Sequence, residues 1–140
     1  MSKKSVKKPA YTCAEKPELV LKHLVRPEDL NGNGTLFGGQ MLSWMDIAGA
    51  IIVASHAQTG ILLAGVNEVN FITPGFKGDI LEFYAWIERV GKTSIHVRIE
   101  ARRKHILATK DTKPDVIASS LYSYAAVNEN RQPITVKPIS

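Results

Sequence analysis

The residues most able to do chemistry are an aspartate and a pair of glycines just before it. Gly38 and Gly39 precede an apolar stretch, and Asp46 is the only carboxylate within that stretch. Free backbone N–H groups at the start of a helix favour negative charge, either on a phosphate or on the oxyanion that forms during acyl transfer. A carboxylate that faces a cleft can act as a general base or as a nucleophile. The spacing therefore predicts an anion-stabilising loop and a reactive carboxylate, about 10 Å apart along one helix.

Both features also have structural interpretations. Two glycines before a helix are more often a flexible turn than an anion site. Asp46 could lie on a solvated edge or accept hydrogen bonds from Ser43 or nearby backbone, because an unpaired buried carboxylate costs several kcal/mol. The functional interpretation has Asp46 facing a cleft, with small neighbours that leave room for a ligand. These neighbours are Gly39, Ser43, Gly49 and Ala50.

The element that carries Asp46 is predicted to be a buried helix from Gln40 to about Thr59. Its apolar residues recur at three- and four-residue spacing, and it contains no proline. Gly60 is expected to cap its C-terminus. The preceding segment, 32–39, holds four glycines in eight residues, and each glycine costs about 1 kcal/mol relative to alanine in a helix. This segment is therefore predicted to be a loop that allows close backbone approach.

Strands are predicted on both sides of this helix. One lies near Glu18 to Val25, and a loop from Pro27 to Gly34 then presents Asn31, whose plain interpretation is a turn residue. Further strands are expected at 61–72, 79–90, 93–101 and 116–127. Alternation in the second and third of these predicts a core face made of Leu81, Phe83, Ala85, Ile87, Ile95, Val97 and Ile99. One helix surrounded by about five long antiparallel strands predicts an α+β fold class.

The opposite face of the strand at 79–90 is more apolar than a solvated surface requires. Tyr84 and Trp86 both lie on it. Partial exposure is one interpretation, and a subunit interface is the favoured one.

Two runs of residues resemble one family. Asn31 to Gly39 reads Asn-x-x-Gly-x-x-Phe-Gly-Gly, and Met45 to Ala50 reads Met-Asp-x-x-Gly-Ala. This pattern resembles the hot-dog-fold acyl-CoA thioesterases of the YciA and brain acyl-CoA hydrolase type. The similarity continues through 69–74, 78–79 and 90–95, and covers roughly 25–127. The resemblance implies a long central helix wrapped by a five- to six-stranded antiparallel sheet. It also implies self-association as a dimer, assembled further as a trimer of dimers, with active sites between subunits.

The resemblance also implies roles for individual residues. Asp46 becomes the catalytic carboxylate, and Asn31, from the other subunit, positions water or substrate. A backbone N–H at Gly38 or Gly39 polarises the thioester carbonyl. Thr35 departs from the family pattern, in which many members carry aspartate or asparagine, and it is expected to serve as a helix cap. The implied reaction cleaves acyl-CoA to a free fatty acid and coenzyme A, and no cofactor is implied because coenzyme A is part of the substrate and product.

The candidate residues for binding coenzyme A rest on the resemblance and on side-chain charge. By resemblance, Lys92, Thr93 and Ser94 lie near the nucleotide, and the basic residues Arg103 and Lys104 suit its phosphates. Phe71 is a candidate contact of the acyl group. The default interpretation of the cations at 92, 98 and 102–104 is a solvated sheet edge that discourages aggregation.

Composition restricts the remaining classes. A chain of 140 residues with 44% hydrophobic content fits one domain, expected at 13–127 between a disordered basic tail at 1–12 and a loose tail at 128–140. Four lysines in the first tail supply most of the net charge of +5, and no nucleic-acid recognition motif follows them. No membrane span or signal peptide is visible, so a cytoplasmic location is expected. Cys13, the single cysteine, is expected to be an incidental thiol.

Other catalytic classes find little support. The four histidines show no metal-ligand spacing, and no Gly-x-Ser-x-Gly elbow is present. Two alternatives remain open. A hot-dog dehydratase or hydratase resembles a pattern with a catalytic histidine, which the segment 31–39 lacks. A non-enzymatic acyl-CoA sensor would keep the pocket and lose the carboxylate, whereas Asp46 is present.

Overall fold

The structure, a computed structural model, describes residues 16–136. The predicted basic tail at 1–12 and Cys13 lie outside the described residues. The elements in chain order are β1 (Glu18–Leu24), the short 3-10 helix η1 (Pro27–Asp29), α1 (Gly38–Ala57), β2 (Gly60–Phe71), β3 (Ile80–Val90), β4 (Ser94–Arg103) and β5 (Val116–Val127). The predicted helix and all five predicted strands are present, and their ends agree within about two residues, the usual uncertainty of such boundaries.

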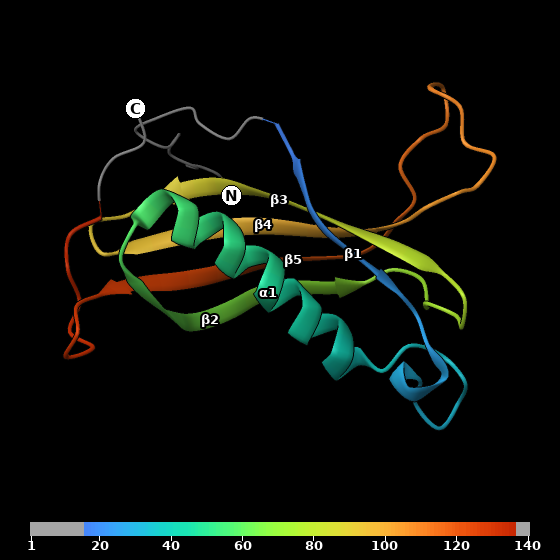
Figure 1. The fold of residues 1–140 in the computed structure, drawn as a ribbon, viewed down its shortest axis with the longest axis horizontal. Coiled ribbons are helices and arrows are strands. Elements are labelled where there is room, and N and C mark those ends of the chain that lie inside the picture. The colour runs from blue at the N-terminus through green and yellow to red at the C-terminus, as the bar shows by residue number, and fades with distance from the viewer. Residues whose placement is uncertain (1–15, 137–140) are drawn as a thin grey trace, which may run out of the picture.

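The five strands form one antiparallel sheet in the order β1-β3-β4-β5-β2, and α1 lies across one face of it (Figure 1). The sheet edges among the described strands are therefore β1 and β2. The interpretation of the basic residues around β4 as a sheet edge is wrong, because β4 pairs with β3 on one side and β5 on the other.

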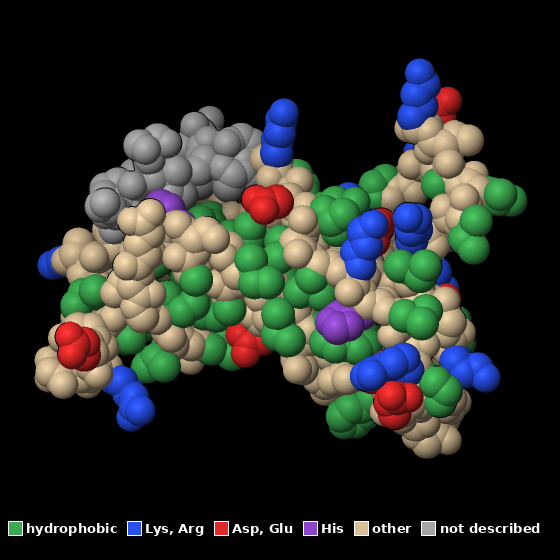
Figure 2. Space-filling model, in the orientation of Figure 1, with side chains coloured by type: hydrophobic (Ala, Val, Ile, Leu, Met, Phe, Trp, Pro, Cys, Tyr) green, Lys and Arg blue, Asp and Glu red, His purple; other side chains and the backbone are tan. Residues whose placement is uncertain are grey.

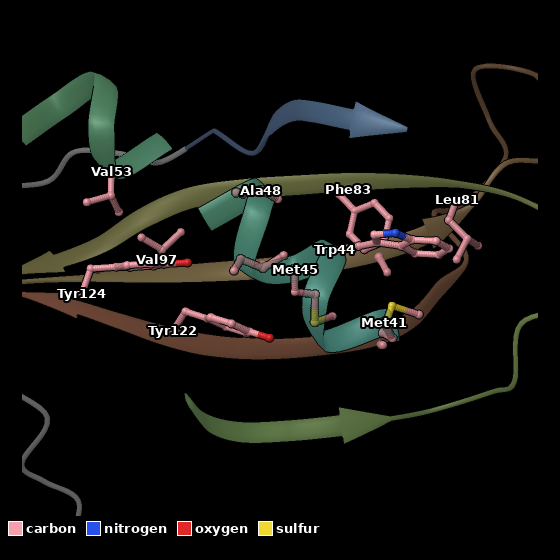
Figure 3. Packing of buried hydrophobic residues seen from close by; sticks show 14 of the residues in the cluster. Met41, Trp44, Met45, Ala48, Val53, Leu81, Phe83, Val97, Tyr122 and Tyr124 are labelled. Atoms are coloured by element: carbon pink, nitrogen blue, oxygen red, sulfur yellow. The ribbon is translucent and has the colours of Figure 1, made fainter. Parts of the chain in front are cut away.

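The hydrophobic core lies between α1 and the sheet. Alternation along β3 and β4 places every second side chain under the helix, and the predicted core face is confirmed, with each of its residues buried. The helix contributes Met41, Trp44, Met45, Ala48, Gly49 and Val53. Figure 3 shows the side chains of Met41, Trp44, Met45, Ala48 and Val53 packed against the sheet, which contributes Phe83 and Val97.

The other face of α1 is exposed, so the helix that the sequence predicts to be buried is buried on one face of the single chain. Ile47 and Ile51 are 47% and 45% exposed. Edge strand β2 exposes further apolar side chains, which include Leu62, Leu63, Val66 and Val69. On this face of the molecule, hydrophobic side chains gather over the middle of α1 (Figure 2). Exposed apolar side chains gathered in this way are typical of an interaction surface.

The helix ends differ in detail from the prediction. Gln58, rather than Gly60, caps the C-terminus in a left-handed conformation with φ of 53°, and its N–H bonds to the carbonyl of Ala54. Gly60 instead begins β2, where an added Cβ would lie 3.1 Å from the carbonyl oxygen of Val127. Close strand approach thus accounts for this glycine.

The segment after β5 differs from the loose tail that the sequence predicts. The side chain of Asn128 accepts hydrogen bonds from the amides of Asn130 and Gln132 at 2.8 and 3.0 Å, which forms a turn. The returning chain bonds to β5 and to the β3–β4 hairpin through the amides of Ile134 and Val136. Val136 is 6% exposed, so burial of its side chain joins the end of the described chain to the domain.

A loop between β4 and β5, residues 104–115, projects from the sheet (Figure 1). The most exposed large apolar residues of the described chain, Ile106 and Leu107, lie on it. Within residues 16–136, no helix is long and apolar enough to span a membrane.

Candidate active site

Asp46 lies two turns into α1 and is bonded to Tyr124 of β5. The Tyr124 hydroxyl lies 2.9 Å from Asp46 Oδ1 and 2.9 Å from the Asp46 carbonyl oxygen. One turn earlier, the Tyr122 hydroxyl donates to the carbonyl of Leu42 at 2.7 Å. Residues two apart on a strand are about 6.6 Å apart, close to the ~6 Å rise over the four helical residues from Leu42 to Asp46. This match lets both tyrosines reach the helix from one face of β5 (Figure 3).

Both tyrosines stay protonated donors. Burial raises the pKa of Tyr124 far above its ordinary value, and the hydrogen bond to Asp46 raises it further. Burial likewise raises the pKa of Tyr122, with a smaller contribution from the charge of Asp46. A protonated phenol has a hydrogen to donate and a carboxylate oxygen can only accept, so Tyr124 donates to Asp46 and holds one oxygen of its carboxylate in place.

Gly49 is required by this contact. A Cβ at Gly49 would lie 2.5 Å from the Tyr124 hydroxyl and 3.1 Å from Cδ1 of Ile99. Gly49 is therefore part of the packing that supports Tyr124. Of the four small residues predicted to leave room for a ligand, Gly49 is buried, whereas Gly39 and Ser43 are exposed.

Asn31 organises its own loop. Its Oδ1 accepts hydrogen bonds from the amides of Asn33 and Thr35 at 2.8 and 3.1 Å, and its Nδ2 donates to Thr35 Oγ1 at 3.0 Å. The turn interpretation of Asn31 therefore describes its contacts within one chain. Thr35 does not cap the helix as predicted: the N-cap is Phe37, which makes no side-chain capping bond.

Gly38 and Gly39 form the first turn of α1. Within residues 16–136, their amides have no acceptor in the protein, as expected at a helix start. A hollow of about 280 Å³ lies beside Gly38. It is lined by Leu36, Gly38, Met41, Phe71, Ile72, Thr73, Pro74 and Gly75. Free N–H donors next to a mostly apolar hollow suit a carbonyl oxygen that gains negative charge.

One charged group near this turn was missed by the sequence analysis. Asp29 is buried, and its carboxylate binds Arg26 and the side chain of Gln40. The hydrogen bonds from Arg26 hold the pKa of Asp29 at about 2, although burial by itself would raise it. The available signal was the pattern Arg-Pro-x-Asp from Arg26 to Asp29, since proline at the first position of a short helix places residues three apart on one side.

Comparison with known proteins decides the family. A model of the thioesterase superfamily matches residues 33–109. The acyl-CoA thioester hydrolase YciA of Salmonella typhimurium is 34% identical over 116 residues, which cover 83% of this chain and 87% of the relative. The chain belongs to the thioesterase superfamily.

Solved structures agree with this assignment. A hexameric hot-dog-fold thioesterase of Campylobacter jejuni has a TM-score of 0.76 and 31% identity, covering 86% of this chain and 90% of its own. An acyl-CoA hydrolase from Staphylococcus aureus, solved with butyryl coenzyme A and coenzyme A, has a TM-score of 0.79 and 28% identity, covering 86% and 71%. The thioesterase therefore has the hot-dog fold, in which α1 is wrapped by the sheet.

A single chain of this thioesterase does not bring all the predicted coenzyme A contacts together. Lys92, Thr93 and Ser94 lie at the β3–β4 hairpin, whereas Arg103 and Lys104 lie at the far end of β4. A ten-residue strand places these two groups about 30 Å apart. Phe71 lies in neither group, because it lines the hollow beside Gly38.

The basic residues near β4 are mostly engaged by acidic side chains. Arg98 contacts Glu68 and Glu88 at 3.0 and 2.9 Å. Arg102 contacts Glu100 at 2.7 Å and stacks over the Tyr84 ring at 4.0 Å, which partly covers the predicted interface face.

Arg103 is held by contacts within the chain. It donates to the Pro74 carbonyl at 2.7 Å and lies 3.6 and 3.7 Å from carboxylate oxygens of Asp79 and Asp115. Arg103 and Lys104 both line two hollows of about 260 and 400 Å³ beside the loop 104–115, but Lys104 is exposed whereas Arg103 is half-buried. Among the predicted phosphate contacts at this end of the sheet, the more accessible cation is therefore Lys104. No group of three metal-ligating side chains occurs in the described part of the chain.

Proposed function

We propose that this chain hydrolyses acyl-CoA thioesters to a free fatty acid and coenzyme A, with Asp46 as the reacting carboxylate. The observation that carries the proposal is the position of Asp46 within the apolar helix α1. Tyr124 holds one oxygen of its carboxylate, and the first turn of the same helix offers free backbone amides. The similar proteins of Salmonella and Staphylococcus are acyl-CoA hydrolases, which supports the substrate class.

Two routes use the same groups. As a general base, Asp46 takes a proton from water, whose oxygen attacks the thioester carbon; the C–S bond then breaks and the coenzyme A thiolate takes up a proton. As a nucleophile, an Asp46 oxygen attacks the same carbon, releasing coenzyme A and forming a mixed anhydride that water hydrolyses. In both routes the carbonyl oxygen becomes an oxyanion, and a backbone N–H at Gly38 or Gly39 stabilises it. Such a donor is worth about 10²–10³ in rate.

The reacting groups are contributed by two copies of the chain. Within one chain, the amide of Gly39 and the carboxylate of Asp46 are two helical turns apart, about 10 Å, whereas a thioester needs both within hydrogen-bond reach of one carbonyl group. Edge strand β2, with Leu62, Leu63, Val66 and Val69 exposed, supplies a surface for pairing. The Campylobacter protein is hexameric, which supports self-association; the arrangement that we propose for this chain is a trimer of dimers.

The same assembly allows the distant binding residues to serve one ligand. Asn31 of one subunit positions water or substrate against Asp46 of the other. Phe71 contacts the acyl group, and the two separate sets Lys92–Ser94 and Arg103–Lys104 contact the nucleotide from different subunits. Within the second set, Lys104 carries more of the phosphate binding than Arg103, because Arg103 is held by Asp79 and Asp115.

The first experiment is thiol release from acyl-CoA esters of two to eighteen carbons, with wild type and Asp46→Ala side by side. Wild type is expected to turn over, and Asp46→Ala to lose about 10²-fold or more in kcat, since a general base contributes 10²–10⁴. Glu129→Ala, in an exposed turn after β5, is the control and keeps full activity. If wild type binds coenzyme A but cleaves no ester, the acyl-CoA sensor replaces the hydrolase.

Isotope labelling can identify the nucleophilic route. A single turnover in ¹⁸O-water, followed by mass analysis of peptides that contain Asp46, detects label in the carboxylate if water cleaves a mixed anhydride at the aspartyl carbon. Label only in the fatty acid is expected from the general-base route and also from an anhydride that water opens at its acyl carbon.

A further inference from the structure

Asp29 forms a buried junction between the end of β1 and the start of α1. Its side chain is 1% exposed. Oδ2 accepts hydrogen bonds from the Arg26 amide at 2.9 Å and from Arg26 Nε at 3.1 Å. Oδ1 accepts from Arg26 Nη2 at 3.1 Å and from Gln40 Nε2 at 3.0 Å. One carboxylate therefore binds residues on both sides of the loop 30–37.

The backbone of Asp29 adds a further contact to the same turn. Its carbonyl oxygen accepts a hydrogen bond from the amide of Phe37 at 2.9 Å. Phe37 and Gln40 directly flank Gly38 and Gly39. The two glycines thus lie between two residues that are both bonded to Asp29.

This restraint matters because the first turn of α1 has little else to hold it. Glycine is the weakest helix former apart from proline, since its backbone loses the most conformational freedom on ordering. The N-cap Phe37 makes no side-chain capping bond. Within the described chain, the Gln40–Asp29 bond is the side-chain hydrogen bond that ties this turn to the rest of the protein.

We propose that Asp29 is a positioning residue, which acts through Gln40 and Phe37 to orient the amides of Gly38 and Gly39 toward the substrate carbonyl. This inference rests on the proposed hydrolase function for its kinetic consequence. Asp29 touches no substrate in this scheme. Its effect on the rate arises because preorganised donors stabilise an oxyanion only when they already point at it.

Arg26 completes the arrangement by balancing charge. A bare carboxylate near the first turn would repel the oxyanion that the amides stabilise. The guanidinium contacts both oxygens of Asp29, so the pair carries no net charge. Arg26 also contacts Glu28 at 3.2 Å, but Glu28 is exposed and does not reach α1.

The test compares Gln40→Met with Glu28→Gln. Gln40→Met keeps the length of the side chain and removes its donor, whereas Glu28→Gln alters the same network on its solvent side. We expect Gln40→Met to lower kcat by about tenfold with KM within about twofold of wild type, because the lost interaction acts in the transition state. Affinity for a non-hydrolysable thioether analogue of acyl-CoA stays unchanged. Glu28→Gln retains wild-type kcat and KM.

A second readout does not depend on turnover. Amide hydrogen exchange in a peptide that covers residues 36–42, followed by mass spectrometry, should be faster in Gln40→Met and Asp29→Asn than in wild type and Glu28→Gln. Unchanged exchange in both variants overturns the positioning role whether or not the chain hydrolyses any ester. Faster exchange and a lower melting temperature with unchanged kcat leave Asp29 a purely structural residue and also overturn it. An inactive wild type contradicts the proposed function alone, since the exchange result still decides the positioning of the amides.

Discussion

The hydroxyl of Tyr124 donates a hydrogen bond to Asp46 Oδ1 at 2.9 Å and links the middle of α1 to β5. These residues are 78 positions apart in the chain. The bond occupies one carboxylate oxygen and leaves the other available to water or substrate. Tyr122 makes the same kind of bond one turn away, to the Leu42 carbonyl, so the two tyrosines offer a natural comparison between a structural and a functional hydroxyl.

Tyr124→Phe is expected to lower both stability and activity. Removing either hydroxyl leaves a helix acceptor unpaired, so Tyr124→Phe and Tyr122→Phe should each lower the free energy of unfolding by about 1–3 kcal/mol. Only Tyr124→Phe should also lower kcat, by about tenfold, because a misplaced catalytic group loses part of its rate advantage. Chemical denaturation and thiol release measure the two effects. Equal kcat values in the two variants would show that Tyr124 has no role beyond packing.

Gly49→Ala tests the space that the Tyr124 contact requires. Alanine gains about 1 kcal/mol of helix propensity, but its Cβ would lie 2.5 Å from the Tyr124 hydroxyl. Overpacking of a core typically costs about 1–3 kcal/mol, so we expect net destabilisation and a lower kcat.

The double variant Gly49→Ala with Tyr124→Phe supplies the control for this contact. Removing the hydroxyl relieves the closest contact, so the stability cost of Gly49→Ala should be smaller in the Tyr124→Phe background than in wild type. If the stability costs of the two substitutions are additive, the strain that Gly49→Ala introduces lies elsewhere, for example against Ile99.

Asp29 is expected to contribute to stability in a defined pH window. The hydrogen bonds from Arg26 hold its folded pKa at about 2, below the ordinary 3.8. A lowered folded pKa gives a contribution that is complete above the unfolded pKa and is lost as the pH falls through the folded one. The melting temperatures of wild type and Asp29→Asn should therefore differ most above about pH 4 and converge toward pH 2. Ser55→Ala, an exposed neutral change, should give a difference that does not vary with pH.

Complementation tests the shared site. Asn31→Ala and Asp46→Ala should each be inactive alone, but random pairing of the two co-expressed chains should restore roughly a quarter of wild-type activity, since half of the dimers carry one intact site out of two. Purified mixtures that cannot exchange subunits should stay inactive. No recovery after co-expression, with mixed dimers demonstrated, would place both residues of a site in one chain.

Leu62→Lys tests β2 as the pairing edge. A charge on an edge strand opposes strand addition, so this variant should dissociate to monomers and lose most activity, as measured by light scattering and thiol release. Leu24→Lys places the same charge on the other sheet edge, β1, at a side chain of similar exposure, and should remain assembled. Assembly that survives Leu62→Lys would assign the interface to another surface.

The sequence was sufficient to predict the elements and the core face. The alternation of apolar residues along β3 and β4 is local information. Every second residue from Leu81 to Ile87 and from Ile95 to Ile99 points inward, as that alternation requires. It also made Asp46 the candidate catalytic residue, because a carboxylate within an apolar helix is unusual.

What only the tertiary structure decided is how these residues are held. The Tyr124–Asp46 bond and the gap that Gly49 leaves for it depend on how β5 is placed against α1, and no local pattern encodes that contact. The strand order places β4 at the centre of the sheet, where Arg98 and Arg102 form ion pairs with glutamates. Asp29 lies within the predicted loop 27–34, and only its burial beside Arg26 and Gln40 shows its contact with the start of the helix. Periodicity is a property of neighbours in sequence, whereas charge pairing and close packing depend on neighbours in space.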